Sequence, residues 1–115
     1  YRAPYLIETA RAVCEGFPLE ALRDMPYEEA HARLTALKGV GDKVADCVLL
    51  FGFHRLECCP MDVWMKRVFA VLYPNGLPDC ARDFAGIAQQ YLFHYSRLHP
   101  ELFAEKTAHP PANRR

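Results

Sequence analysis

The feature that most constrains this chain is a turn, Gly39-Val40-Gly41, between two stretches of helical spacing within about residues 34–51. Two glycines around one apolar residue allow a sharp reversal with positive φ, while the valine turns inward. The segment therefore predicts a helix-hairpin-helix. Amides at the start of the second helix have no acceptor inside it and lie at the positive end of its dipole, which suits an anion. Lys43 falls in that first turn, where the dipole opposes its charge, and this is the first indication of function.

Helical spacing also accounts for the rest of the chain and predicts an all-α fold. We expect helices at about residues 4–15, 18–24, 26–37, 42–51, 63–73 and 80–97. The helix at 42–51 is apolar nearly all round and should be buried. Asp62 directly precedes a helix, where aspartate is a good N-cap. We expect one domain over residues 1–103, followed by a disordered tail at 104–115 that lacks periodicity.

Composition excludes several classes of protein. The chain has 115 residues, enough for one ordinary globular domain, and no apolar run near the roughly 20 residues of a membrane helix. Fourteen basic and fourteen acidic residues cancel, which argues against a sequence-independent DNA coat but not against an enzyme that holds a few phosphates through backbone amides. Five cysteines without Cys-x-x-Cys spacing favour neither zinc nor a disulfide framework. We therefore expect reduced thiols, no metal site and an intracellular protein.

Two motifs give the chain a resemblance to a known family. The run Leu37-Lys38-Gly39-Val40-Gly41-Asp42-Lys43-Val44-Ala45-Asp46, followed by Pro60-Met61-Asp62-Val63, resembles the helix-hairpin-helix, Gly/Pro-rich loop and aspartate signature of DNA glycosylases. Within that superfamily the chain is similar to the C-terminal half of 8-oxoguanine DNA glycosylases, from Tyr1 to about Phe103. The resemblance implies an all-α helix-hairpin-helix catalytic domain, a compact multi-helix bundle from which the family's N-terminal domain is absent. The chain starts mid-pattern without methionine, as a fragment of a longer protein would.

The resemblance also implies a bifunctional glycosylase/lyase that removes 8-oxoguanine from duplex DNA. Lys43 would attack C1′ of the deoxyribose, and the resulting Schiff base would permit β-elimination on the 3′ side. An amine attacks carbon only in its neutral form, so we expect this lysine to be half-buried. Asp62 would stabilise the cationic sugar and orient the amine.

A base inside a duplex is out of reach, so further residues are expected to hold an extruded nucleotide. In Gly86-Ile87-Ala88-Gln89-Gln90-Tyr91-Leu92-Phe93, Gln89 resembles the family residue that bonds the Watson–Crick edge, and Phe93 the ring that stacks on the base. Cys47 would cover the other face, and Phe51 would line the same pocket. Plainer roles stay open: a packed pair with a solvated glutamine, a small buried thiol and a core ring.

Other residues are expected to contact DNA outside the base pocket. The amides around Gly39-Val40-Gly41 would hold a phosphate, and Lys66 on the later helix could meet another. In the family a monovalent cation often bridges such a hairpin to the phosphate; no cofactor is required. Tyr1 and Arg2 resemble the pair that wedges into the gap and contacts the orphaned base, with a frayed chain start as the alternative.

Duplex DNA with a damaged base is thus the expected partner of a monomeric, DNA-associated protein of the cytoplasm, nucleoid or nucleus. Two alternatives stay open. One is a glycosylase of the same superfamily for another damaged base, although Gln89, Phe93 and Cys47 together favour oxidised guanine. The other is a truncated, non-catalytic helix-hairpin-helix DNA-binding module. Neutral charge and the absent N-terminal domain favour that module, whereas Lys43 with Asp62 argues against it.

Overall fold

The computed structural model describes residues 1–104, and every regular element in that range is a helix, which confirms the predicted all-α class. The longer elements are α1 (Ala3–Cys14), α2 (Tyr27–Thr35), α3 (Asp42–Cys47), α4 (Val63–Leu72) and α5 (Ala85–Leu98). Between and after them come η1 (Glu20–Arg23), η2 (Val48–Gly52), η3 (Asp79–Phe84) and η4 (Pro100–Leu102). Within residues 1–104 no helix has the length and apolar character needed to cross a membrane. The predicted tail lies outside the described residues, apart from Ala104.

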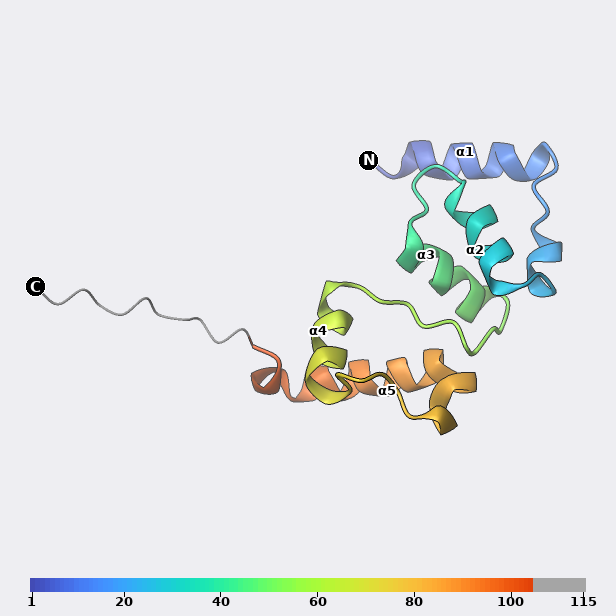
Figure 1. The fold of residues 1–115 in the computed structure, drawn as a ribbon. Helices are drawn as coiled ribbons and strands as arrows, with labels where there is room; N and C mark the ends of the chain where they lie inside the picture. The colour runs from blue at the N-terminus through green and yellow to red at the C-terminus, as the bar shows by residue number, and fades with distance from the viewer. Residues whose placement is uncertain (105–115) are drawn as a thin grey trace, which may run out of the picture.

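The helices form two groups joined by the long loop 53–62 (Figure 1). α1, α2 and α3 lie in one group, and α4 and α5 pack together in the other. Each group has its own buried cluster. The first consists of Leu22, Ala30, Leu34, Ala45, Leu49, Leu50 and Cys58. The second consists of Met65, Val68 and Phe103.

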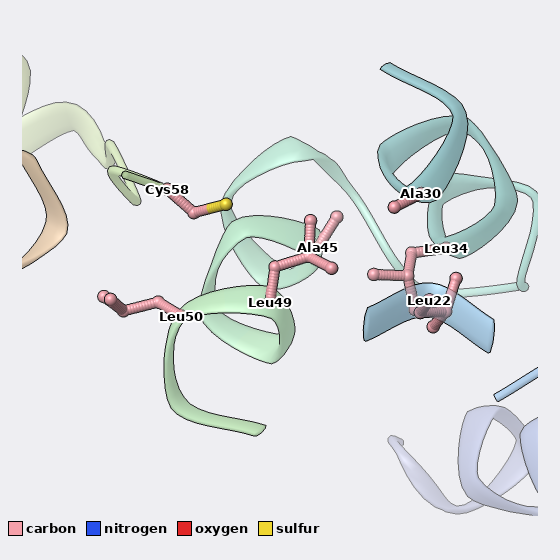
Figure 2. Packing of buried hydrophobic residues seen from close by; sticks show 7 residues of the cluster. All are labelled: Leu22, Ala30, Leu34, Ala45, Leu49, Leu50 and Cys58. Carbon is pink, nitrogen blue, oxygen red and sulfur yellow. The ribbon is translucent and has the colours of Figure 1, made fainter. Parts of the chain in front are cut away.

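The first cluster holds the second helix of the hairpin in place. Ala45 and Leu49 are four residues apart and lie on one face of the continuous helix formed by α3 and η2. Both side chains are fully buried. Figure 2 shows this face toward η1 and α2, which contribute Leu22, Ala30 and Leu34. Cys58, from the connecting loop, reaches the other side of the same helix (Figure 2). The hairpin is therefore anchored by apolar packing on both sides.

The helix after the hairpin differs from the sequence prediction in two ways. It is α-helical only to Cys47, and η2 continues it as a wider π-helical turn in which Leu49 and Leu50 are both buried. It is also not buried all round, because Val44 is 43% exposed and Phe51 is 64% exposed. Both side chains line surface pockets rather than the core.

α1 is the predicted helix, but its apolar side is open. Leu6 and Ile7 are 72% and 58% exposed, and none of its twelve residues is buried. Its contact with the hairpin runs through Tyr5, whose ring lies where a Cβ on Gly39 would be. Gly39 has a φ of +85°, so glycine is required there both for its backbone conformation and for the approach of Tyr5.

The predicted long helix over residues 80–97 is broken. η3 runs to Phe84, whose φ of −125° leaves the helical region before α5 begins. The first turn of α5 instead contacts the connecting loop, because the amide of Gly86 donates to the carbonyl of Leu56 at 2.9 Å. This tertiary hydrogen bond joins the second group of helices to the loop, and no local pattern predicts it.

The buried thiol of Cys58 leads to a prediction about alkaline pH. Burial raises the pKa of this thiol from 9.0 to about 11, and the negative charge of Glu57 adds to the rise. In the unfolded chain the thiol ionises near its ordinary pKa, so the stability that the neutral buried thiol contributes is fully present below that pH. It is lost as the pH rises through the folded value. We expect the free energy of unfolding to fall by on the order of 2 kcal/mol over this range.

Urea unfolding at about pH 8 and about pH 11 measures this loss. Cys58→Ala should lower stability at both values and reduce the difference between them. Cys80→Ala is the matched control, since that cysteine is exposed, and it should leave the difference as it is in the parent protein. A pH difference as large in Cys58→Ala as in Cys80→Ala would contradict the assignment.

Candidate active site

One pocket brings together the predicted catalytic and base-binding residues. It has a volume of about 250 Å³ and is lined by Lys43, Cys47, Phe51, Pro60, Asp62, Met65, Gln89, Gln90 and Phe93. Every residue that the sequence singles out for catalysis or base binding is among them. They come from α3 and η2, from the loop end with the first turn of α4, and from α5. The pocket therefore lies where the two groups of helices meet.

The hairpin helix contributes three side chains to this pocket. Lys43, Cys47 and Phe51 follow one another at intervals of four residues, so they share one face of the helix. Lys43 is exposed rather than half-buried as the sequence predicted, because the helix buries its opposite face through Ala45 and Leu49. The amine is thus accessible to a ligand that enters the pocket.

Cys47 shares the pocket with two charged groups, Lys43 and Asp62. Burial raises the pKa of its thiol, the positive charge of Lys43 opposes this rise, and the negative charges of Asp46 and Asp62 add to it. Lys43, Cys47 and Asp62 all line this pocket, so the charges of the lysine and the aspartate act on the thiol. A neutral thiol presents a small, polarisable surface to a ligand.

Asp62 is held rigidly at the start of α4. Its Oδ1 accepts a hydrogen bond from the amide of Met65 at 2.8 Å, which confirms the predicted N-cap. α4 is in turn tied to α5, because Trp64 Nε1 donates to the hydroxyl of Ser96 at 2.9 Å. That hydroxyl donates to the carbonyl of Phe93 at 2.7 Å. The carboxylate and the ring of the base pocket are thereby positioned relative to each other.

α5 contributes an amide and an aromatic ring. Gln89 and Phe93 are one turn apart and both line the pocket. Gln89 is only 6% exposed, so the alternative of a solvated glutamine is wrong. Gln90 lines the pocket as well, and its Nε2 donates to Gln89 Oε1 at 2.6 Å. Sequence reasoning missed this residue, because the next position along a helix points about 100° away and no spacing pattern links it to Gln89.

A larger open pocket of about 780 Å³ adjoins the first through Lys43, which lines both. It lies between α1 and the hairpin and is lined by Tyr1, Arg2, Tyr5, Leu6, Thr9, Ala10, Lys38, Gly39, Val40, Lys43 and Val44. Three of these side chains are basic and none is acidic, which suits a phosphate backbone. The predicted wedge residues and the hairpin thus lie on the same side as the lysine.

Known proteins with similar sequences are DNA glycosylases. No family model matches the sequence. The probable N-glycosylase/DNA lyase of Methanothermobacter thermautotrophicus is 38% identical over 107 residues, which covers 84% of this chain and 34% of the relative. The N-glycosylase/DNA lyase of Saccharomyces cerevisiae is 37% identical over 79 residues, covering 59% of this chain and 21% of the relative.

Solved structures agree with these relatives. MBOgg1 in complex with a low-affinity DNA ligand superimposes with a TM-score of 0.76 at 38% identity, over 87% of this chain and 38% of that one. The 8-oxoguanine glycosylase/lyase of Clostridium acetobutylicum, in complex with double-stranded DNA containing cytosine opposite 8-oxoguanine, gives a TM-score of 0.72 at 33% identity, over the same shares of the two chains. The resemblance to 8-oxoguanine DNA glycosylases is confirmed. The chain spans about a third of the length of the first of these relatives.

The hairpin is the part of the chain predicted to hold a phosphate, and not all of its amides are free to do so. The amide of Val40 donates to the carbonyl of Leu37 at 3.1 Å and closes the turn. Within residues 1–104 the amides of Gly39 and Gly41 make no backbone hydrogen bond. An anion at this hairpin would therefore be held by the two glycine amides.

None of the six residues predicted to contact DNA outside the base lines the base pocket, and these are Tyr1, Arg2, Gly39, Val40, Gly41 and Lys66. Tyr1 is 94% exposed, and its hydroxyl accepts from Arg2 Nε at 3.2 Å, so the pair projects together from the start of the chain. Lys66 is exposed on α4 and lines neither pocket. Gly41, in the hairpin turn, is also exposed and lines neither pocket. Among residues 1–104 no group of three or more His, Cys, Asp or Glu side chains is arranged to hold a metal ion.

Proposed function

We propose that this chain forms the catalytic part of a DNA glycosylase with lyase activity that removes 8-oxoguanine from duplex DNA. The observation that carries the proposal is the single pocket in which an exposed amine, Lys43, lies with the capped carboxylate of Asp62 and the buried amide of Gln89. The relatives and solved structures named above support it. Damaged duplex DNA would be the partner of a monomeric intracellular protein. A monovalent cation would bind at the hairpin backbone, and no cofactor would be required.

The chemistry follows from the positions of the amine and the carboxylate. Lys43 Nζ, as the neutral amine, attacks C1′ of the extruded nucleotide and then gives up a proton. The bond from C1′ to the base breaks, and the base leaves with the bonding electrons and takes up a proton. Opening of the sugar ring turns the adduct into a Schiff base between Nζ and C1′. Loss of a C2′ proton then expels the 3′ phosphate, and water hydrolyses the Schiff base to restore the lysine. Asp62 places its negative charge where the sugar becomes cationic.

The base itself would lie between the two groups of helices. Cys47 on α3 and Phe93 on α5 line the pocket from two different helices, and a planar purine held between them would have a thiol on one face and a ring on the other. Gln89 would bond its Watson–Crick edge. Phe51, exposed at the rim, would cover the entrance.

Borohydride trapping with a set of duplexes tests this proposal. The protein should form a covalent adduct with a duplex holding 8-oxoguanine opposite cytosine and with an abasic duplex. An undamaged duplex should give none. An adduct with oxidised pyrimidines alone would indicate another glycosylase of the superfamily. Duplex binding without an adduct on any damaged substrate would indicate the non-catalytic DNA-binding module.

A further inference from the structure

We propose that Gln90 is a positioning residue that holds the amide of Gln89 in the orientation required to bond the extruded base. The inference rests on the proposed function, since the orientation of this amide matters for catalysis only if a base enters the pocket. Neither residue is explained by packing alone: Gln89 is a buried polar side chain in the wall of the pocket, and Gln90 is an exposed neighbour turned back onto it.

The contact between the two amides carries the proposal. Gln90 Nε2 donates to Gln89 Oε1 at 2.6 Å. No other side chain within residues 1–104 bonds the side chain of Gln89, so this hydrogen bond is what restrains it there. One lone pair on Oε1 and both hydrogens on Nε2 are then left for a ligand.

A glutamine amide has nearly the same shape after a half-turn, but the turn exchanges its donor end and its acceptor end. The Watson–Crick edge of a guanine-type base carries an acceptor, O6, beside a donor, N1–H. An amide can bond both atoms at once in only one of its two orientations. If Gln89 turned alone, its Nε2 would face the Nε2 of Gln90, donor against donor, and their hydrogen bond would be lost. Gln90 therefore opposes a turn of Gln89 alone, and only a turn of both amides together would keep a hydrogen bond between them.

Two substitutions at Gln90 separate this role from a structural one. Gln90→Glu replaces the donor by a group that only accepts, so it should turn Nε2 of Gln89 toward itself. Gln90→Met keeps the length of the side chain and removes the hydrogen bond. At limiting DNA we expect kcat/KM on 8-oxoguanine duplex to fall about fivefold for Gln90→Met, which corresponds to the loss of one neutral hydrogen bond. We expect a larger fall for Gln90→Glu.

The lyase reaction on a preformed abasic duplex is the internal control, because that substrate carries no base for Gln89 to bond. Both substitutions should lower this rate less than the rate on 8-oxoguanine duplex, and His94→Ala, an exposed position one turn further on α5, should change neither reaction. Equal losses on both substrates would show that Gln90 acts on the fold. Unchanged rates on both, or a smaller loss in Gln90→Glu than in Gln90→Met, would overturn the proposal.

A measurement without activity keeps the two proposals apart. In the free protein, Gln89→Met removes the acceptor, so the side-chain amide protons of Gln90 should move upfield in the NMR spectrum and exchange faster with water. Unchanged signals would overturn the positioning role. If the parent protein forms no adduct even with abasic DNA, the proposed function fails while this measurement still decides whether Gln90 holds Gln89.

Discussion

Lys43→Gln is expected to abolish the borohydride-trapped adduct with both 8-oxoguanine and abasic duplexes. The amide nitrogen of glutamine has no free lone pair to attack C1′, so neither the covalent intermediate nor the Schiff base can form. We expect a loss of about 10³-fold or more, in line with the removal of a nucleophile from other enzymes. Duplex binding should weaken by less than about tenfold, because at most one phosphate contact is lost. Gel analysis of the adduct and fluorescence anisotropy of labelled duplex measure the two effects.

Lys66→Gln is the matched control for this substitution. It removes the same charge from an exposed lysine of α4 that lines neither pocket. Adduct formation at saturating protein should be retained, while affinity falls slightly and its salt dependence becomes weaker. If the adduct survived in Lys43→Gln and disappeared in Lys66→Gln, the assignment of the nucleophile to Lys43 would be wrong.

Gly86→Ala has the largest expected effect on stability. A Cβ at this position would overlap the carbonyl oxygen of Cys58 and come within 2.6 Å of Leu50 Cδ1. The carbonyl belongs to the backbone and cannot rotate away, so α5 would have to separate from the connecting loop. The hydrogen bond from Gly86 to the carbonyl of Leu56 would be strained as well. We expect a loss of about 3 kcal/mol, toward the upper end of the usual range for overpacking, measured by chemical unfolding.

Gly52→Ala provides the comparison. Its Cβ would meet only Val48 Cγ1, at 4.0 Å, which is ordinary contact. We expect a change within about 0.5 kcal/mol for this substitution. Similar losses in the two variants would show that the close approach of α5 to the loop does not contribute to stability. Since the loop leads to Asp62 and α5 carries Gln89, Gly86→Ala should also lower the rate on 8-oxoguanine duplex more than Gly52→Ala does.

Local features of the chain were predictable from its sequence. The glycine turn, the helices around it and the cap at Asp62 depend on residues within about one helical turn of each other, and spacing and propensity describe such interactions well. The same holds for the shared face of Lys43 and Cys47. The roles of Gln89 and Phe93 in base binding came from the family resemblance, and the structure places both in one pocket with the lysine.

The remaining features depend on contacts between segments that are far apart in the chain. The break before α5 accompanies the close approach of Gly86 to Cys58 and Leu56, and the exposure of Lys43 follows from which face of its helix packs on α2. The bond from Gln90 to Gln89 joins neighbours that no periodicity pairs. The sequence by itself determined the helices, the turn and the chemical groups they carry. Only the tertiary structure decided how the two groups of helices meet, because the pocket between them is made by long-range packing.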